Sequence, residues 1–196
     1  MTAIRVVAFD LGGVLVDVDL AVLPRALGRE AARVEEALFG GDRHERLSTG
    51  ALGAEPFVRE AARALDVDED QIRAAWGDVV RARDGARALV ERVRARAVAW
   101  SNTDPIHVAR LAPTLSPRLF DEGRALSYEI AAMKPARAFT ERAVARLGVA
   151  PSEIFFVDDR AENVAAARAA GVEAAVTRSI AETAELLSQR GLLDDA

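Results

Sequence analysis

Six residues of types that act on phosphate groups are spread along the chain: Asp10, Ser101, Asn102, Lys134, Asp158 and Asp159. A carboxylate can serve as a nucleophile or as a metal ligand. Carboxylate oxygens suit Mg²⁺, and a lysine supplies a point charge to phosphate oxygens. Each residue alone also fits an ordinary role in a turn, a helix cap or an exposed loop. It is the ordered set that predicts phosphoryl transfer.

Three predicted strands end at these polar residues. Residues 4–10 are an apolar run that ends at Asp10, residues 97–100 are followed by Ser101, and residues 154–157 run into Asp158. Continuous apolar runs ended by turn residues are typical of strands buried on both faces. Because the carboxyl ends of parallel strands lie at one edge of a sheet, we expect these side chains to converge. Gly12 and Gly13 then allow a sharp turn and the close approach of a bound group.

The segment after the first strand has a different character. Residues 14–19 alternate apolar and acidic side chains, which predicts a short hairpin or flap with one wet face. Residues 20–84 are rich in Ala, Arg, Glu and Leu with glycine breaks, and they predict short helices and no strand. Such an insert indicates a small separate subdomain. We therefore expect a core of residues 1–16 and 86–196 and a helical cap of residues 17–85.

Beyond the cap, helices and strands alternate. Helices are expected over residues 86–95, after Pro105 with Asp104 or Thr103 as the cap, from Pro135 to Gly148, before Gly171, and after Ser179; strands are expected over 126–128 and 172–176. This alternation predicts an α/β fold, with a doubly wound, Rossmann-like parallel sheet and a small helical cap inserted after the first strand.

The composition limits the class of protein. The chain has 196 residues, 51% hydrophobic and 29% charged, which fits a soluble protein of one or two domains, either a monomer or a homodimer. A net charge of −5 offers no basic surface for nucleic acid. With no signal peptide and no apolar run of membrane-spanning length, the expected location is cytoplasmic. The absence of cysteine excludes thiol chemistry, and two histidines make a multi-histidine metal site improbable.

Four short motifs, in order along essentially the whole chain, resemble those of the haloacid dehalogenase (HAD) superfamily of hydrolases. They are Phe-Asp10-Leu-Gly-Gly, Ser101-Asn-Thr, Lys134-Pro and Phe-Phe-Val-Asp158-Asp159. The set is most similar to that of small bacterial sugar-phosphate phosphatases, including the branch that cleaves α-D-glucose 1-phosphate. The resemblance implies a phosphatase that acts on a small phosphorylated metabolite.

The same resemblance implies a role for each residue. Asp10 attacks phosphorus and forms an aspartyl-phosphate. Lys134 and Ser101 hold phosphate oxygens, and Asn102 helps through its backbone or its side-chain amide. The expected metal is Mg²⁺, held by the residues Asp10, Gly12 (through its carbonyl), Asp159 and Asp158 (directly or through water).

One position departs from the family pattern. The family's usual first motif has a second Asp, a general acid/base, at the position of Gly12. Since such help is worth roughly 10²–10⁴-fold, turnover should favour good leaving groups: anomeric, aryl or acyl phosphates. Asp17, Asp19 or a cap residue could replace the acid. The alternatives are a catalytically impaired domain that binds a phosphometabolite or a protein, and a 2-haloacid dehalogenase, which needs no paired Asp158 and Asp159.

The remaining polar and aromatic residues have two interpretations each. His107 fits a half-exposed helical position as well as a substrate contact, and Asn163 fits either a carboxylate-orienting role or an exposed one. His44, Glu45 and Arg46 are expected on a solvated helix face, with substrate selection as the alternative. Trp76 and Trp100 are expected in the core.

Overall fold

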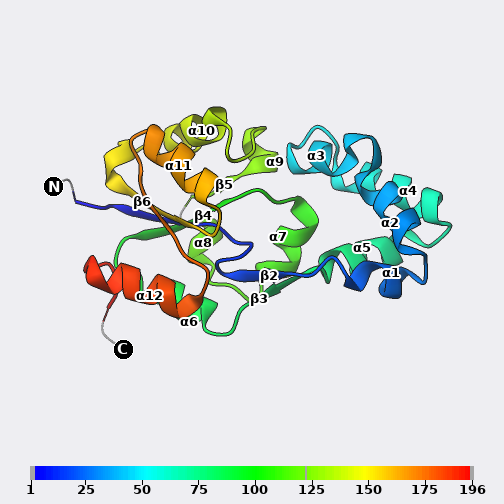
Figure 1. The fold of residues 1–196 in the computed structure, drawn as a ribbon, viewed down its shortest axis with the longest axis horizontal. Coiled ribbons are helices and arrows are strands. Elements are labelled where there is room, and N and C mark those ends of the chain that lie inside the picture. The colour runs from blue at the N-terminus through cyan, green and yellow to red at the C-terminus, as the bar shows by residue number, and fades with distance from the viewer. Residues whose placement is uncertain (1–2, 122, 195–196) are drawn as a thin grey trace.

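Five parallel strands form the central sheet of the computed structural model, which describes residues 3–121 and 123–194 (Figure 1). In spatial order they are β5 (Ala125–Leu126), β4 (Arg96–Ser101), β1 (Val6–Phe9), β6 (Ile154–Asp158) and β7 (Glu173–Val176). β1 lies in the middle, with Val6 opposite Arg96 on one side and Ile154 on the other. The chain therefore adds strands first on one side of β1 and then on the other, which places a topological switch point beside β1.

Helices cover both faces of this sheet. Val7 and Phe9 face the buried side chains of α6 (Ala86–Glu91), α7 (Pro105–Leu111), α8 (Arg118–Asp121) and α12 (Ile180–Gln189). Val6 and Ala8 face those of α10 (Arg137–Leu147) and α11 (Ala161–Ala169), and α9 (Ser127–Ile130) packs against α10. The predicted doubly wound sheet is confirmed, because neighbouring residues of β1 belong to opposite faces.

A helical insert follows the first strand, as predicted, and we call it the cap. It contains α1 (Val22–Leu27), α2 (Ala31–Phe39), the 3₁₀ turn η1 (Gly40–Asp42), α3 (Arg43–Ser48), α4 (Ala54–Leu65) and α5 (Glu69–Gly77). Its buried side chains continue into the apolar cluster on one face of the sheet. The domain bounds at residues 16/17 and 85/86 stay a prediction, and residues 1–2 and 195–196 of the expected core lie outside the described residues.

The expectation of no strand within residues 20–84 is wrong. β2 (Val16–Val18) pairs antiparallel with β3 (Val80–Ala82), so the chain enters and leaves the cap through one two-stranded ribbon. A three-residue strand with an arginine at its centre has too little alternation to stand out from the helix before it. Its partner lies more than sixty residues earlier in the chain, and only tertiary structure reveals that pairing.

Most predicted helix ends are confirmed. Asp104 caps α7 by accepting hydrogen bonds from the N–H groups of Ile106 and His107, and Ser179 caps α12. Gly148 ends α10 in the left-handed conformation that glycine favours. The helix expected over residues 86–95 is shorter than predicted: α6 ends at Glu91. Over the described residues no helix has the length and apolar character needed to cross a membrane.

Candidate active site

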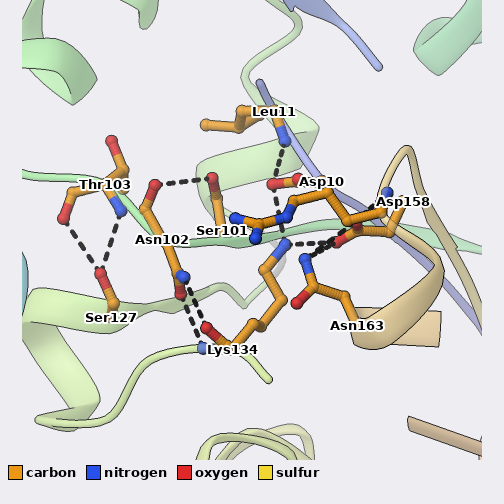
Figure 2. A network of polar contacts seen from close by, with 10 residues as sticks. Asp10, Leu11, Ser101, Asn102, Thr103, Ser127, Lys134, Asp158 and Asn163 are labelled. Atoms are coloured by element: carbon orange, nitrogen blue, oxygen red, sulfur yellow. Dashed lines mark hydrogen bonds and ion pairs between the residues drawn. The ribbon is translucent and has the colours of Figure 1, made fainter. Parts of the chain in front are cut away.

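The carboxyl ends of three neighbouring strands bring the predicted residues together. Asp10 follows β1, Ser101 ends β4 and Asp158 ends β6. A cavity of about 460 Å³ opens at this edge of the sheet. Its lining includes the predicted residues Asp10, Gly12, Asn102, Lys134 and Asp159. Figure 2 shows the side chains of Asp10, Ser101, Lys134 and Asp158 turned toward one another.

Asp10 is held firmly in this cavity. Its Oδ1 accepts a hydrogen bond from the Leu11 N–H at 2.7 Å and lies 2.9 Å from Lys134 Nζ. Burial, with a smaller contribution from the charge of Asp158, raises the pKa of Asp10 from 3.8 to about 6, although the charge of Lys134 and its hydrogen bond act to lower it. The Lys134 ammonium therefore favours the ionised carboxylate that a nucleophile or metal ligand needs.

Lys134 is positioned at both its ends. Its Nζ lies between two carboxylates, 2.9 Å from Asp10 and 2.6 Å from Asp158. The backbone of Lys134 forms two hydrogen bonds with the side chain of Asn102 (Figure 2). Asn102 Nδ2 donates to the Lys134 carbonyl at 2.9 Å, and Asn102 Oδ1 accepts from the Lys134 N–H at 2.8 Å. The amide of Asn102 thus orients Lys134, a contact the sequence did not indicate.

Asp158 is fully buried, and both oxygens of its carboxylate accept hydrogen bonds. Besides Lys134, its carboxylate accepts the Arg160 N–H at 2.9 Å and the side-chain amide of Asn163 at 2.9 and 3.0 Å. The carboxylate-orienting interpretation of Asn163 is confirmed. These contacts make Asp158 the fixed centre that holds Lys134 in place.

A metal ion fits beside the carboxylates of Asp10 and Asp158. Oxygen atoms of Asp10, Asp158 and Asp159 lie within 4.8 Å of one another. Within the part of the chain that the structure describes, the carboxylate of Asp159 has no hydrogen-bond or ion-pair partner. Gly13 makes room for it, since a Cβ at Gly13 would lie 2.2 Å from Asp159 Oδ2. Three carboxylates in this arrangement suit a hard divalent cation such as Mg²⁺.

The candidate replacements for the missing acid differ in position. Asp17 lines the cavity, but its Oδ1 accepts a hydrogen bond from Arg83 Nε at 2.7 Å. Asp19 accepts from the Ala21 N–H and is not part of the lining. At Gly12 itself a Cβ would have Val18 Cγ2 as its nearest neighbour, at 3.4 Å. The backbone at this position therefore has room for a side chain.

A second buried network, which sequence reasoning missed, joins the cap to the core. Asp104 Oδ2 accepts the indole N–H of Trp76 at 3.1 Å and lies 2.9 Å from His107 Nδ1. His107 Nε2 lies 2.9 Å from the Trp76 carbonyl, and the two rings stack. The expectation of a half-exposed His107 is wrong, because helix spacing alone could not reveal the cap helix that covers it.

The structure confirms some of the remaining expectations for aromatic and cap residues and contradicts the one for His44. Trp76 and Trp100 are buried, as predicted. Glu45 and Arg46 are exposed on α3, whereas His44 is half-buried and packs against Phe39 and Trp76. His44 therefore faces inward, toward the cap–core boundary.

Fold and site together define an α/β enzyme with a carboxylate-centred site at a switch point of its sheet. The chain belongs to the haloacid dehalogenase-like hydrolases, whose family model matches residues 4–171.

Three solved structures illustrate the similarity. A HAD family enzyme from Bacteroides thetaiotaomicron, BT-2542, solved with magnesium and inorganic phosphate, is 24% identical, with a TM-score of 0.76 over 89% of this chain and 94% of that one. A predicted HAD-like family hydrolase from Porphyromonas gingivalis is 25% identical, with a TM-score of 0.75 over 99% and 100%. An L-2-haloacid dehalogenase, PA0810, is 14% identical, with a TM-score of 0.70 over 95% and 100%. For BT-2542 and for this dehalogenase the likeness concerns the fold alone.

Proposed function

We propose that the protein is a Mg²⁺-dependent phosphatase that hydrolyses a small phosphorylated metabolite through an aspartyl-phosphate. The observation that carries this is the buried Asp10, 2.9 Å from Lys134 Nζ and grouped with Asp158 and Asp159. A lysine and a metal-compatible carboxylate cluster around one carboxylate match what a phosphoryl group needs. The magnesium and phosphate bound by the Bacteroides enzyme support the same assignment.

In this mechanism a carboxylate oxygen of Asp10 attacks phosphorus. The bond from phosphorus to the leaving oxygen breaks, and the leaving oxygen takes up a proton from solvent water. Water then attacks the phosphorus of the aspartyl-phosphate, which releases inorganic phosphate and restores Asp10. Lys134 and Ser101 hold phosphate oxygens, and Asn102 keeps Lys134 aimed at them.

Asp10, Asp159 and the Gly12 carbonyl would hold Mg²⁺, and Asp158 would support it. When bound, the ion supplies positive charge that offsets the negative charge of the phosphoryl group. Gly13 allows Asp159 to reach this position because no side chain intervenes.

The substrates turned over fastest should carry good leaving groups, since Gly12 offers no proton donor. The resemblance to sugar-phosphate phosphatases adds an anomeric sugar phosphate, such as α-D-glucose 1-phosphate, to the compounds to be tested. Aryl and acyl phosphates meet the same requirement.

The test is phosphate release from p-nitrophenyl phosphate, α-D-glucose 1-phosphate and acetyl phosphate, with Mg²⁺ and with a chelator. The expected result is release that needs the metal and is abolished in Asp10→Asn. Binding of Mg²⁺ without release from any of the three would reject the phosphatase and favour a binding domain, the alternative that Gly12 raises. Halide release from a 2-haloacid without metal would favour a dehalogenase.

A further inference from the structure

A second cavity, of about 200 Å³, adjoins the phosphate site on its cap side. The two cavities share lining residues, among them Gly12, Val18 and Asn102. The other residues that line the second cavity come from both the cap and the core, and they include Phe39 and Trp76. A group attached to a phosphate at Asp10 can therefore extend into it.

The walls of this cavity are mostly apolar. Leu11 and Leu111 come from the core, Val18 and Val80 from the ribbon, and Phe39 and Trp76 from the cap. By contrast, the phosphate cavity is lined by charged and amide groups. The site is thus divided into one polar and one apolar compartment.

Most polar groups of the apolar compartment are already engaged. The Asp104 carboxylate accepts hydrogen bonds from Trp76 and two backbone N–H groups, and both ring nitrogens of His107 face oxygens. The Asn102 amide is bound to the backbone of Lys134. Apart from Ser101 beside Asp10, this leaves mainly His44 and Thr103, and His44 Nε2 already has Ser48 Oγ at 3.4 Å.

We propose that this compartment receives the leaving group, and that it selects phosphate esters of compact, ring-sized apolar alcohols or phenols over esters of polyols. The assignment rests on the proposed function and narrows its substrate class. An apolar ring gains from burial against Phe39, Trp76 and Val80. A polyol would bury several hydroxyls where few partners remain, and each unpaired hydroxyl is costly.

The rate of hydrolysis depends on the chemical reactivity of the leaving group as well as on how well the compartment binds it. The first experiment therefore measures binding instead of hydrolysis. Benzylphosphonate and 2,3-dihydroxypropylphosphonate are not hydrolysed, and both are titrated calorimetrically into the whole protein with Mg²⁺. Burying one aromatic ring predicts a Kd at least about tenfold lower for benzylphosphonate. Equal Kd values, tighter binding of the polyol, or no binding of either compound would overturn the assignment.

A variant and its control test the wall itself. Val18→Asn adds hydrogen-bonding groups to the wall at a half-exposed position that tolerates them, and it should reduce the preference at least about threefold. Val144→Asn, the same change on α10 outside both cavities, should leave the preference unaltered. An unchanged preference in Val18→Asn would contradict the role of this wall.

Hydrolysis of acetyl phosphate tests the proposed phosphatase activity separately from the proposed substrate class, because the acetyl group is too small to depend on the apolar compartment. Its Mg²⁺- and Asp10-dependent hydrolysis together with no phosphonate preference would reject only the substrate class. No phosphate release from acetyl phosphate, p-nitrophenyl phosphate or α-D-glucose 1-phosphate, together with a clear preference for benzylphosphonate, would reject the phosphatase but keep the apolar selection of the cavity.

Discussion

Replacing Asp104 by asparagine tests the network that fastens the cap to the core. The wild-type carboxylate is 1% exposed and accepts the N–H groups of Ile106 and His107 through Oδ1 and the indole N–H of Trp76 through Oδ2. In Asp104→Asn the oxygen can keep the helix cap, but an amide NH₂ then faces the Trp76 N–H and leaves that buried donor without an acceptor.

The magnitude follows from these contacts. A hydrogen bond to a charged group contributes about 1.5–3 kcal/mol, and a buried donor left unpaired costs about 1–3 kcal/mol. Both ranges include the cost of losing the same hydrogen bond from Trp76, so they are not added in full. We expect Asp104→Asn to lower the free energy of unfolding by about 3 kcal/mol. For a chain of this length that corresponds to roughly 6–12 °C in Tm.

The loss of unfolding free energy caused by Asp104→Asn should become smaller at acidic pH. Burial raises the pKa of Asp104, but the hydrogen bonds and charge of His107 and the Trp76 N–H outweigh it, so the pKa lies below its ordinary 3.8. A lowered carboxyl pKa contributes stability that is present above the unfolded-state value and lost as pH falls through the folded-state value. The difference in unfolding free energy between wild type and Asp104→Asn should therefore narrow as the pH falls below about 4.

Urea unfolding at several pH values measures this, and the same two helices supply the control. Asp78, at the end of α5, forms an exposed ion pair with Arg110 of α7 at 2.8 Å. Asp78→Asn should cost less than about 1 kcal/mol. A loss in Asp104→Asn no greater than in this control, or a difference that does not narrow in acid, would refute the reasoning.

Three further substitutions address the active site. Gly12→Asp introduces a carboxyl where the nearest side-chain atom is 3.4 Å from the new Cβ, and it should raise kcat/KM for glycerol phosphate, a poor leaving group, by about 10²-fold or more, with little gain for p-nitrophenyl phosphate. Gly13→Ala places a Cβ 2.2 Å from Asp159 Oδ2, so calorimetry should show weaker Mg²⁺ binding than in Gly148→Ala, a control that also has a positive φ but has open space around it. Asn102→Ala removes two hydrogen bonds that orient the site lysine, and kcat/KM should fall about 10–30-fold in steady-state assays while Tm changes little.

Much of the fold could be predicted because its signals are local. The apolar run at β1, the cap at Asp104 and the left-handed end at Gly148 each depend on a few adjacent residues. The convergence of polar residues also followed from sequence, because parallel strands order their ends at one edge.

What the sequence did not reveal depends on long-range contacts. Trp76 and Asp104 are 28 residues apart, and nothing in either segment specifies that their helices meet. The grip of Asn102 on the Lys134 backbone spans 32 residues, and its two hydrogen bonds exist only when both loops are in place. Such contacts follow from tertiary packing rather than from local pattern.

The position of β1 at the centre of the sheet also determines how the chain can fold. This strand is entirely buried, yet its partners begin 90 residues later, at Arg96, and 148 residues later, at Ile154. During synthesis most of the chain must therefore be made before both edges of β1 can be paired. Contacts this distant in sequence slow folding and leave apolar surface exposed to other chains in the meantime. The arrangement that places Asp10 between two neighbouring strands thus leaves both edges of β1 open to other chains until residues as far away as Ile154 have been made.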